Sequence, residues 1–169
     1  LGKIIGGGIS TGALMGSDDI MSRMNPDAVG PEQYVLSSGT FVTNSLSAAA
    51  GLATLGELEK PGVYDRLHET GNRLRRGFQE ICRVLGVPAL VVNHGPIVDV
   101  MMTENEEIVD YRTSLSRNSE LESRLAIEMI KRRIFVPTGH HKMYVSLAHS
   151  DHDLDLTLEV FEEALRASL

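Results

Sequence analysis

The sequence opens with LGKIIGGGISTGA, residues 1–13, in which one lysine lies in an apolar stretch directly before three consecutive glycines. Burying an ammonium group costs free energy, and glycine loses more conformational freedom on folding than any other residue. An ordinary core strand would therefore contain neither feature. We expect this segment to serve a purpose that requires both the amine and the glycines.

Spacing excludes two phosphate-binding motifs that combine these residue types. In a phosphate loop of the Walker type, Ser or Thr directly follows the lysine, but here Ile4 follows Lys3. In the dinucleotide-binding fingerprint, a third glycine comes three residues after the second, and that position is Thr11. The segment therefore contains neither of these nucleotide-binding motifs.

Two interpretations of Lys3 remain open from the residues alone. It is a surface lysine at the start of a glycine-rich turn, or it is a Schiff-base lysine whose amine must be desolvated to become nucleophilic. The apolar neighbours Leu1, Ile4 and Ile5 favour desolvation. Adjacent glycines would also allow the backbone to approach a flat cofactor closely.

Length and composition limit the class of protein. The chain has 169 residues, 42% of them hydrophobic, which suffices for a substantial buried core. A formal charge of −7 without any basic block argues against nucleic acid or a membrane surface as a partner. The single cysteine, Cys82, favours a reducing compartment, so we expect a cytoplasmic protein. Because Leu1 lies within an organised motif, we expect a fragment of a longer protein.

Periodicity and capping signals predict a mixed order of helices and strands. An apolar stripe over 61–85 predicts a long helix ended by Gly86, and Ser150 with Asp153 predicts the N-terminus of a last helix. Ser119 with Glu122 is interpreted as a capping box for a further helix. Shorter helices are expected at 17–24 and 45–60, an exposed loop at 103–118, and strands at 88–93, 97–102, 133–136 and 142–148.

Several segments in the same order resemble one enzyme family. LGKIIGGG followed by Gly12-Ala13 is similar to the lysine segment of class III (fold type I) pyridoxal-phosphate aminotransferases, most of all the glutamate-1-semialdehyde 2,1-aminomutases among them. The likeness continues through Gly39-Thr40 with Asn44, AAGLATL (49–55), PGVYDRL (61–67) and SLAH (146–149). It covers nearly the whole chain. Several spaced matches in order are more specific than one short motif.

This resemblance implies a fold and a division of the chain. The fold class is α/β, as the C-terminal part of a pyridoxal-phosphate-dependent transferase fold. Residues 1–64 would form the end of the large cofactor-binding domain, and residues 65–169 a small C-terminal α+β domain. From residue 86 onward, the alternation of predicted strands and helices independently favours a small sheet covered by helices.

The resemblance also implies roles for particular residues. Lys3 would form the Schiff base with pyridoxal 5′-phosphate and then move a proton between the substrate and the cofactor. Thr40, with Gly39 beside it, would reach the cofactor phosphate of the neighbouring subunit, so the family implies a homodimer acting on a small amino-acid or amino-aldehyde substrate. The aspartate, aromatic residue and glycine-serine loop that complete the family's site do not match residues of this sequence. We therefore expect the chain alone to be inactive.

The subfamily is left open by two departures from the aminomutase pattern. The aminomutases usually carry proline where this chain has Ser10 and Ser45. Serine at position 10 is more similar to enzymes that transaminate β-amino acids, whereas SLAH favours the aminomutase. Three functions are thus carried forward: an aminomutase, an aminotransferase for an ω- or β-amino acid, and a non-catalytic dimerisation fragment.

Other reactive side chains are interpreted as structural. The histidines at 140, 141, 149 and 152 lack the spacing of a zinc motif, so no metal site is expected. Cys82 shares the apolar stripe of its helix and is expected to be an inert core residue. Arg132 and Arg133 complement the dipole at a helix end, and a role in binding a substrate carboxylate stays open.

Overall fold

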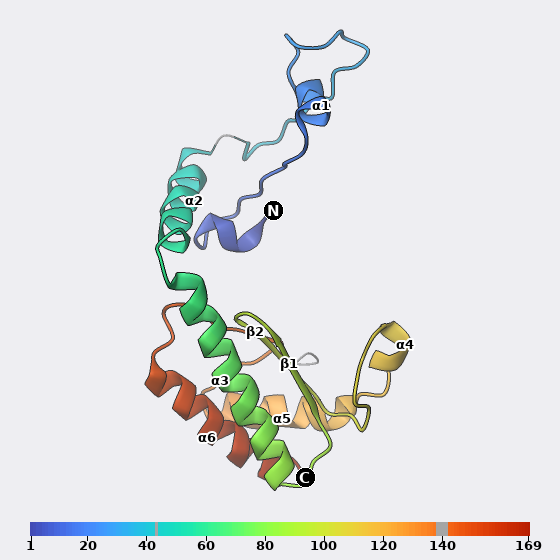
Figure 1. Ribbon diagram of the computed structural model, residues 1–169, viewed down its shortest axis with the longest axis vertical. Helices are drawn as coiled ribbons and strands as arrows, with labels where there is room; N and C mark the ends of the chain where they lie inside the picture. Colours follow the sequence, from blue (N-terminus) through green and yellow to red (C-terminus); the bar gives the residue numbers. More distant parts are fainter. Residues whose placement is uncertain (43, 138–141) are drawn as a thin grey trace. The chain divides into compact units, whose positions relative to one another are not determined.

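The computed structural model describes residues 1–42, 44–137 and 142–169 (Figure 1). The chain forms two compact units, Leu1–Pro61 and Gly62–Leu169, here called the N-terminal and C-terminal units. None of the described helices is long and apolar enough to cross a membrane.

The N-terminal unit consists of short elements around one longer helix. It contains the 3-10 helix η1 (Lys3–Gly6), α1 (Asp18–Met21), the 3-10 helix η2 (Ser22–Met24) and α2 (Ser45–Leu58). Asn44 is the N-cap of α2, because its Oδ1 atom accepts a hydrogen bond of 3.0 Å from the backbone N–H of Ser47. η1 packs directly against α2.

The C-terminal unit places helices against a small antiparallel sheet (Figure 1). The strands β1 (Leu90–His94), β2 (Ile97–Met101) and β3 (Lys142–Tyr144) lie in the order β1-β2-β3. The helices are α3 (Val63–Val84), α4 (Tyr111–Ser114), α5 (Ser119–Lys131) and α6 (Asp151–Ser168). α3 packs on β1, β2 and α6, and α5 packs along α6. The hairpin of β1 and β2 confirms two predicted strands.

The core of this unit is built from the predicted apolar stripes. Leu74, Phe78 and Cys82 of α3 are buried, and the rings of Phe78 and Phe161 lie 4.5 Å apart between centroids. The predicted capping box at the start of α6 is also confirmed, since Ser150 and Asp153 bond each other's backbone. Local periodicity and capping thus place the main elements of the unit.

Three predictions for the C-terminal unit were wrong. Residues 133–136 are not a strand: Arg133 has a left-handed backbone (φ 68°) in the turn after α5, and among the described residues it is β3 that pairs with the second edge of β2. The last strand is shorter than predicted, because pairing with β2 ends at Tyr144. The region 103–118 is not all loop, since Asp110 caps the short helix α4.

A fourth prediction, the capping box at Ser119, was also wrong. Asn118 is the N-cap of α5, and its Oδ1 atom accepts the backbone N–H of Leu121 at 3.0 Å. Glu122 does not reach back to the helix end, because its carboxylate is buried and bonded to groups outside α5. The spacing of Ser119 and Glu122 fits a capping box, but it does not reveal that Arg117 and Met102 bind the Glu122 carboxylate instead.

Candidate functional site

Lys3 lies at the start of η1 with an exposed side chain. Its φ angle of 57° is in the left-handed region, which costs a non-glycine residue about 1 kcal/mol or more. Leu1 and Ile4 are themselves 76% and 74% exposed. Two of the three apolar neighbours are thus exposed within this chain and Ile5 is partly buried, so desolvation of Lys3 stays a prediction.

Residues 3–11, here called the lysine arch, are closed at their base by backbone pairing. Gly2 forms an isolated antiparallel bridge with Gly12, and the backbone N–H of Ala13 donates to the carbonyl of Leu1 at 2.8 Å. Within the arch, Ile9 N–H donates to Gly6 O at 3.0 Å. The arch is thus a defined loop rather than an extended strand.

The glycines of the arch allow it to lie directly on α2. Gly7 has a φ of 57°, and a Cβ atom there would lie 2.5 Å from Thr54 Oγ1 and 2.9 Å from Ala50 O. A Cβ atom on Gly51 of α2 would lie 3.1 Å from Ile5 O. Of the three consecutive glycines, Gly7 therefore has a packing purpose, because only a residue without a side chain permits this approach to α2.

Gly39 and Thr40 lie in a tight turn just before α2. The carbonyl of Gly39 accepts the N–H of Val42 at 3.1 Å, and the carbonyl of Phe41 accepts the N–H of Asn44 at 3.2 Å. Gly39 and Thr40 are exposed, and the Thr40 hydroxyl makes no hydrogen bond within the described part of the chain. The turn therefore has a hydroxyl donor available for an anion such as a phosphate.

The residues present fit pyridoxal phosphate in part. The exposed amine of Lys3 is accessible to an aldehyde, and an exposed hydroxyl in a glycine turn suits a phosphate. Both segments are fixed to the beginning of α2. Groups that would contact the cofactor ring are not found among the residues matched to the family's motifs.

The remaining candidates do not form a second reactive site. His140 and His141 lie outside the described residues. His149 Nδ1 accepts the backbone N–H of Ser146 at 3.0 Å, and no group of three His, Cys, Asp or Glu side chains in the described ranges could hold a metal ion. Arg132 pairs with Glu128 and Glu163. Burial raises the pKa of the Cys82 thiol to about 11, which makes it unreactive.

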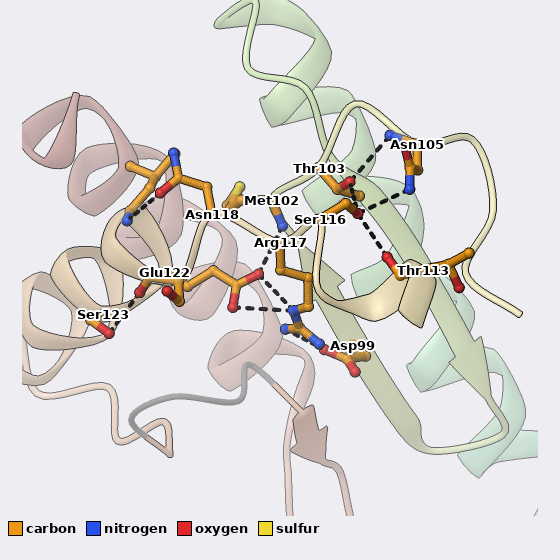
Figure 2. Close-up of polar contacts among 12 residues, drawn as sticks. Asp99, Met102, Thr103, Asn105, Thr113, Ser116, Arg117, Asn118, Glu122 and Ser123 are labelled. Atoms are coloured by element: carbon orange, nitrogen blue, oxygen red, sulfur yellow. Dashed lines mark hydrogen bonds and ion pairs between the residues drawn. The ribbon is translucent and has the colours of Figure 1, made fainter. Parts of the chain in front are cut away.

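A buried polar cluster in the C-terminal unit was missed by the sequence analysis (Figure 2). The Glu122 carboxylate, 1% exposed as a residue, accepts Met102 N–H at 2.9 Å and Arg117 Nε at 2.9 Å. Arg117 also approaches Asp99 at 3.5 Å. The available signal was the position of Glu122 on the buried face of α5, between Leu121 and Leu125. Because each charge has an opposite partner, the cluster is structural.

Comparison with known proteins identifies the relatives of this chain. No protein-family model matches it. It is 35% identical over 167 residues to glutamate-1-semialdehyde 2,1-aminomutase 2 of Brevibacillus brevis, covering 98% of this chain and 38% of that protein. The structure is similar to an omega-transaminase from Sphaerobacter thermophilus, with a TM-score of 0.90, 31% identity, and coverage of 99% of this chain and 37% of that one.

A second solved structure supports the same relationship. The beta-phenylalanine aminotransferase from Variovorax paradoxus has a TM-score of 0.82 and 28% identity, over 99% of this chain and 37% of that one. The chain spans well under half the length of the proteins it matches, 38% for the first of them. The sequence match and the structural match both extend over almost the whole chain. It therefore belongs to the family of pyridoxal-phosphate-dependent aminotransferases that contains glutamate-1-semialdehyde 2,1-aminomutase.

Proposed function

We propose that the full-length protein is a class III pyridoxal-phosphate enzyme that transfers an amino group, with Lys3 as its Schiff-base lysine. The observation that carries the proposal is the lysine arch. Lys3 combines an exposed side chain with a φ of 57°, and strained backbone of this kind clusters at active sites. Identity of 35% to an aminomutase of Brevibacillus brevis supports the reaction type.

Lys3 would have two roles in this reaction. When bound, pyridoxal phosphate supplies an aldehyde that condenses with amines and a ring that withdraws electrons from the reacting carbon. The Lys3 Nζ atom would hold the cofactor and, when free, would carry a proton to and from the substrate carbon. Since the arch is closed at its base and packed on α2, it limits where this amine can move.

Thr40 and Gly39 would bind phosphate across a subunit boundary. The exposed hydroxyl of Thr40 and the backbone of its turn are available to an anion from outside the chain. A homodimer follows if that anion belongs to the neighbouring subunit's cofactor, with two-fold symmetry as the simplest arrangement. The division into an end of the large domain and a small domain is part of the same proposal. The free, buried Cys82 supports a reducing compartment such as the cytoplasm.

The leading substrate type is that of glutamate-1-semialdehyde 2,1-aminomutase. A second candidate, an aminotransferase for an ω- or β-amino acid, is favoured by the names of the omega-transaminase and the beta-phenylalanine aminotransferase. In the first case, the amino group returns to the same substrate molecule. In the second, turnover requires an added keto acid or aldehyde, so dependence on a co-substrate distinguishes the two.

Borohydride reduction of the full-length protein with pyridoxal phosphate tests the role of Lys3. Peptide mapping should find the pyridoxyl label on Lys3, and Lys3→Arg should lose at least about 10³-fold in kcat. Lys60→Arg is the matched control, because Lys60 is an exposed lysine of the same unit that pairs with Glu57. A label on another lysine, or full turnover by Lys3→Arg, would refute the proposal. A protein that neither binds the cofactor nor turns over would favour the non-catalytic alternative.

A further inference from the structure

Ser47 makes a connection that no other residue of α2 makes. Its Oγ atom donates a hydrogen bond of 3.1 Å to the backbone carbonyl of Ser10, which is 37 positions away in the sequence. Among the described residues, this is the sole hydrogen bond between the lysine arch and α2. Ser47 is also 5% exposed, although most polar side chains of the chain face solvent.

The bond of Ser47 differs from the usual bonds of helical hydroxyl groups. Thr54, Ser123 and Ser168 each donate to the carbonyl four residues earlier in their own helix. Such bonds are local and do not join separate segments. Ser47 instead lies in the first turn of α2, where the side chain of Asn44 already accepts its N–H. Its hydroxyl is thus directed to a segment outside the helix.

The other contacts of the arch with α2 do not constrain it in the same way. Gly7 and Gly51 permit close approach of two backbones, but van der Waals contacts have little directional preference. A hydrogen bond has a preferred length and angle. The Ser47 bond therefore specifies where the end of the arch lies along α2. The backbone of Lys3 adopts a strained conformation at the other end of the same arch.

We propose that Ser47 is a positioning residue for Lys3. It acts through the backbone of Ser10 and holds the arch in one place on α2. This fixes the position of the Lys3 Cα atom, from which the side chain extends. The inference rests on the proposed function of Lys3. A small displacement of a reacting group is enough to slow an enzyme markedly, so the effect should be measurable.

Hydrogen exchange on the 169-residue chain tests the structural part of this inference. In Ser47→Ala, the amide hydrogens of Gly7 and Ile9, both hydrogen-bonded within the arch, should exchange about fivefold faster. The amides in the second half of α2 should be unchanged. Ser45→Ala is the matched control, because Ser45 is an exposed serine of the same helix turn. Unchanged exchange at Gly7 and Ile9 would overturn the proposal. If Ser47→Ala does not fold, Ser47→Cys supplies a weaker donor of similar size.

The full-length protein loaded with pyridoxal phosphate tests the functional part. Ser47→Ala should lower kcat about fivefold with KM within about twofold. It should also shift the pH midpoint of the cofactor's absorbance change, which a merely destabilised enzyme would not do. Wild-type kcat and an unshifted midpoint would overturn the positioning role while leaving Lys3 labelling intact. A label found away from Lys3 would instead refute the proposed function, whatever the exchange result.

Discussion

The N-terminal and C-terminal units bury their apolar side chains to very different extents. In residues 1–61, the buried residues described are Gly6 and Ser47, while Leu14, Phe41 and Leu52 are each more than 70% exposed. In residues 62–169, one cluster of apolar side chains joins α3, the sheet, α5 and α6. The C-terminal unit is therefore stabilised by a buried apolar core, whereas the described residues of the N-terminal unit form no such core.

The two longest helices of the two units also differ in how apolar residues are distributed over their surfaces. α3 has a single apolar stripe and polar residues elsewhere, which is typical of a helix with one buried face. α2 carries leucines, alanines and glycines around most of its surface, which is typical of a helix enclosed on all sides. Large exposed apolar areas of this kind mark contact surfaces. Within this chain, α2 is covered mainly by the lysine arch.

Truncating one large apolar side chain in each unit is the strongest test of this comparison. Phe78 is fully buried against Phe161, so Phe78→Ala should lower the free energy of unfolding by about 3–5 kcal/mol. Leu52 is 72% exposed, so Leu52→Ala should change it by less than about 0.5 kcal/mol. Urea unfolding of the 169-residue chain measures both. Equal losses would show that α2 is buried in solution.

Removing the cation of the buried cluster should have the next largest effect. Arg117→Ala leaves the Glu122 carboxylate without its ion pair, which costs about 3 kcal/mol in a buried site. Arg166→Ala is the control, since its pair with Glu162 is exposed and contributes about 0.5 kcal/mol or less. Thermal or urea unfolding compares the two variants. Similar small losses in both would mean that water replaces Arg117 around the carboxylate.

Adding one methyl group to a helical glycine should have opposite effects in the two units. A Cβ atom at Gly71 of α3 would lie 2.0 Å from the carbonyl oxygen of Gly95, so Gly71→Ala should destabilise the hairpin contact by about 2 kcal/mol. At Gly56 of α2, a Cβ atom meets nothing within 4 Å, so Gly56→Ala should stabilise that helix by about 1 kcal/mol. Hydrogen exchange in α2 and urea unfolding provide the measurements. Destabilisation by Gly56→Ala would contradict the open surface there.

The smallest expected effect is a pH dependence at the start of α6. Hydrogen bonds from the side chain and then the backbone N–H of Ser150 lower the pKa of the Asp153 carboxyl. The folded-state pKa therefore lies below the unfolded-state value of about 3.9, and the contribution to stability is complete above that value and lost as pH falls through the folded-state pKa. Asp153→Asn should flatten the fall in stability below about pH 4. Glu159→Gln, on the same helix, should leave that slope as it is in wild type.

Sequence patterns over a few neighbouring residues predicted most of the helices and strands, but they predicted less of the candidate site. The stripe of α3, the hairpin around Gly95 and the capping box of α6 each depend on residues a few positions apart, and all were predicted. The wrong cap at Ser119 depended on Glu122, whose carboxylate is held by Arg117 and by Met102, the latter 20 positions away. The absence of a strand at 133–136 likewise depended on pairing between distant segments, because residues 142–144 pair with the edge of β2.

The amino-acid sequence by itself determined the candidate lysine, the turn containing Thr40, the family and the main helices. The helices are recorded in the spacing of apolar and capping residues a few positions apart, whereas the family resemblance rests on several motifs in the same order along the chain. Tertiary structure alone decided that Gly7 lies on α2, that Leu1 and Ile4 are exposed, and that the Ser47 hydroxyl bonds the carbonyl of Ser10. The physical reason is that these features depend on distances between segments far apart in the sequence, and no local pattern encodes such distances.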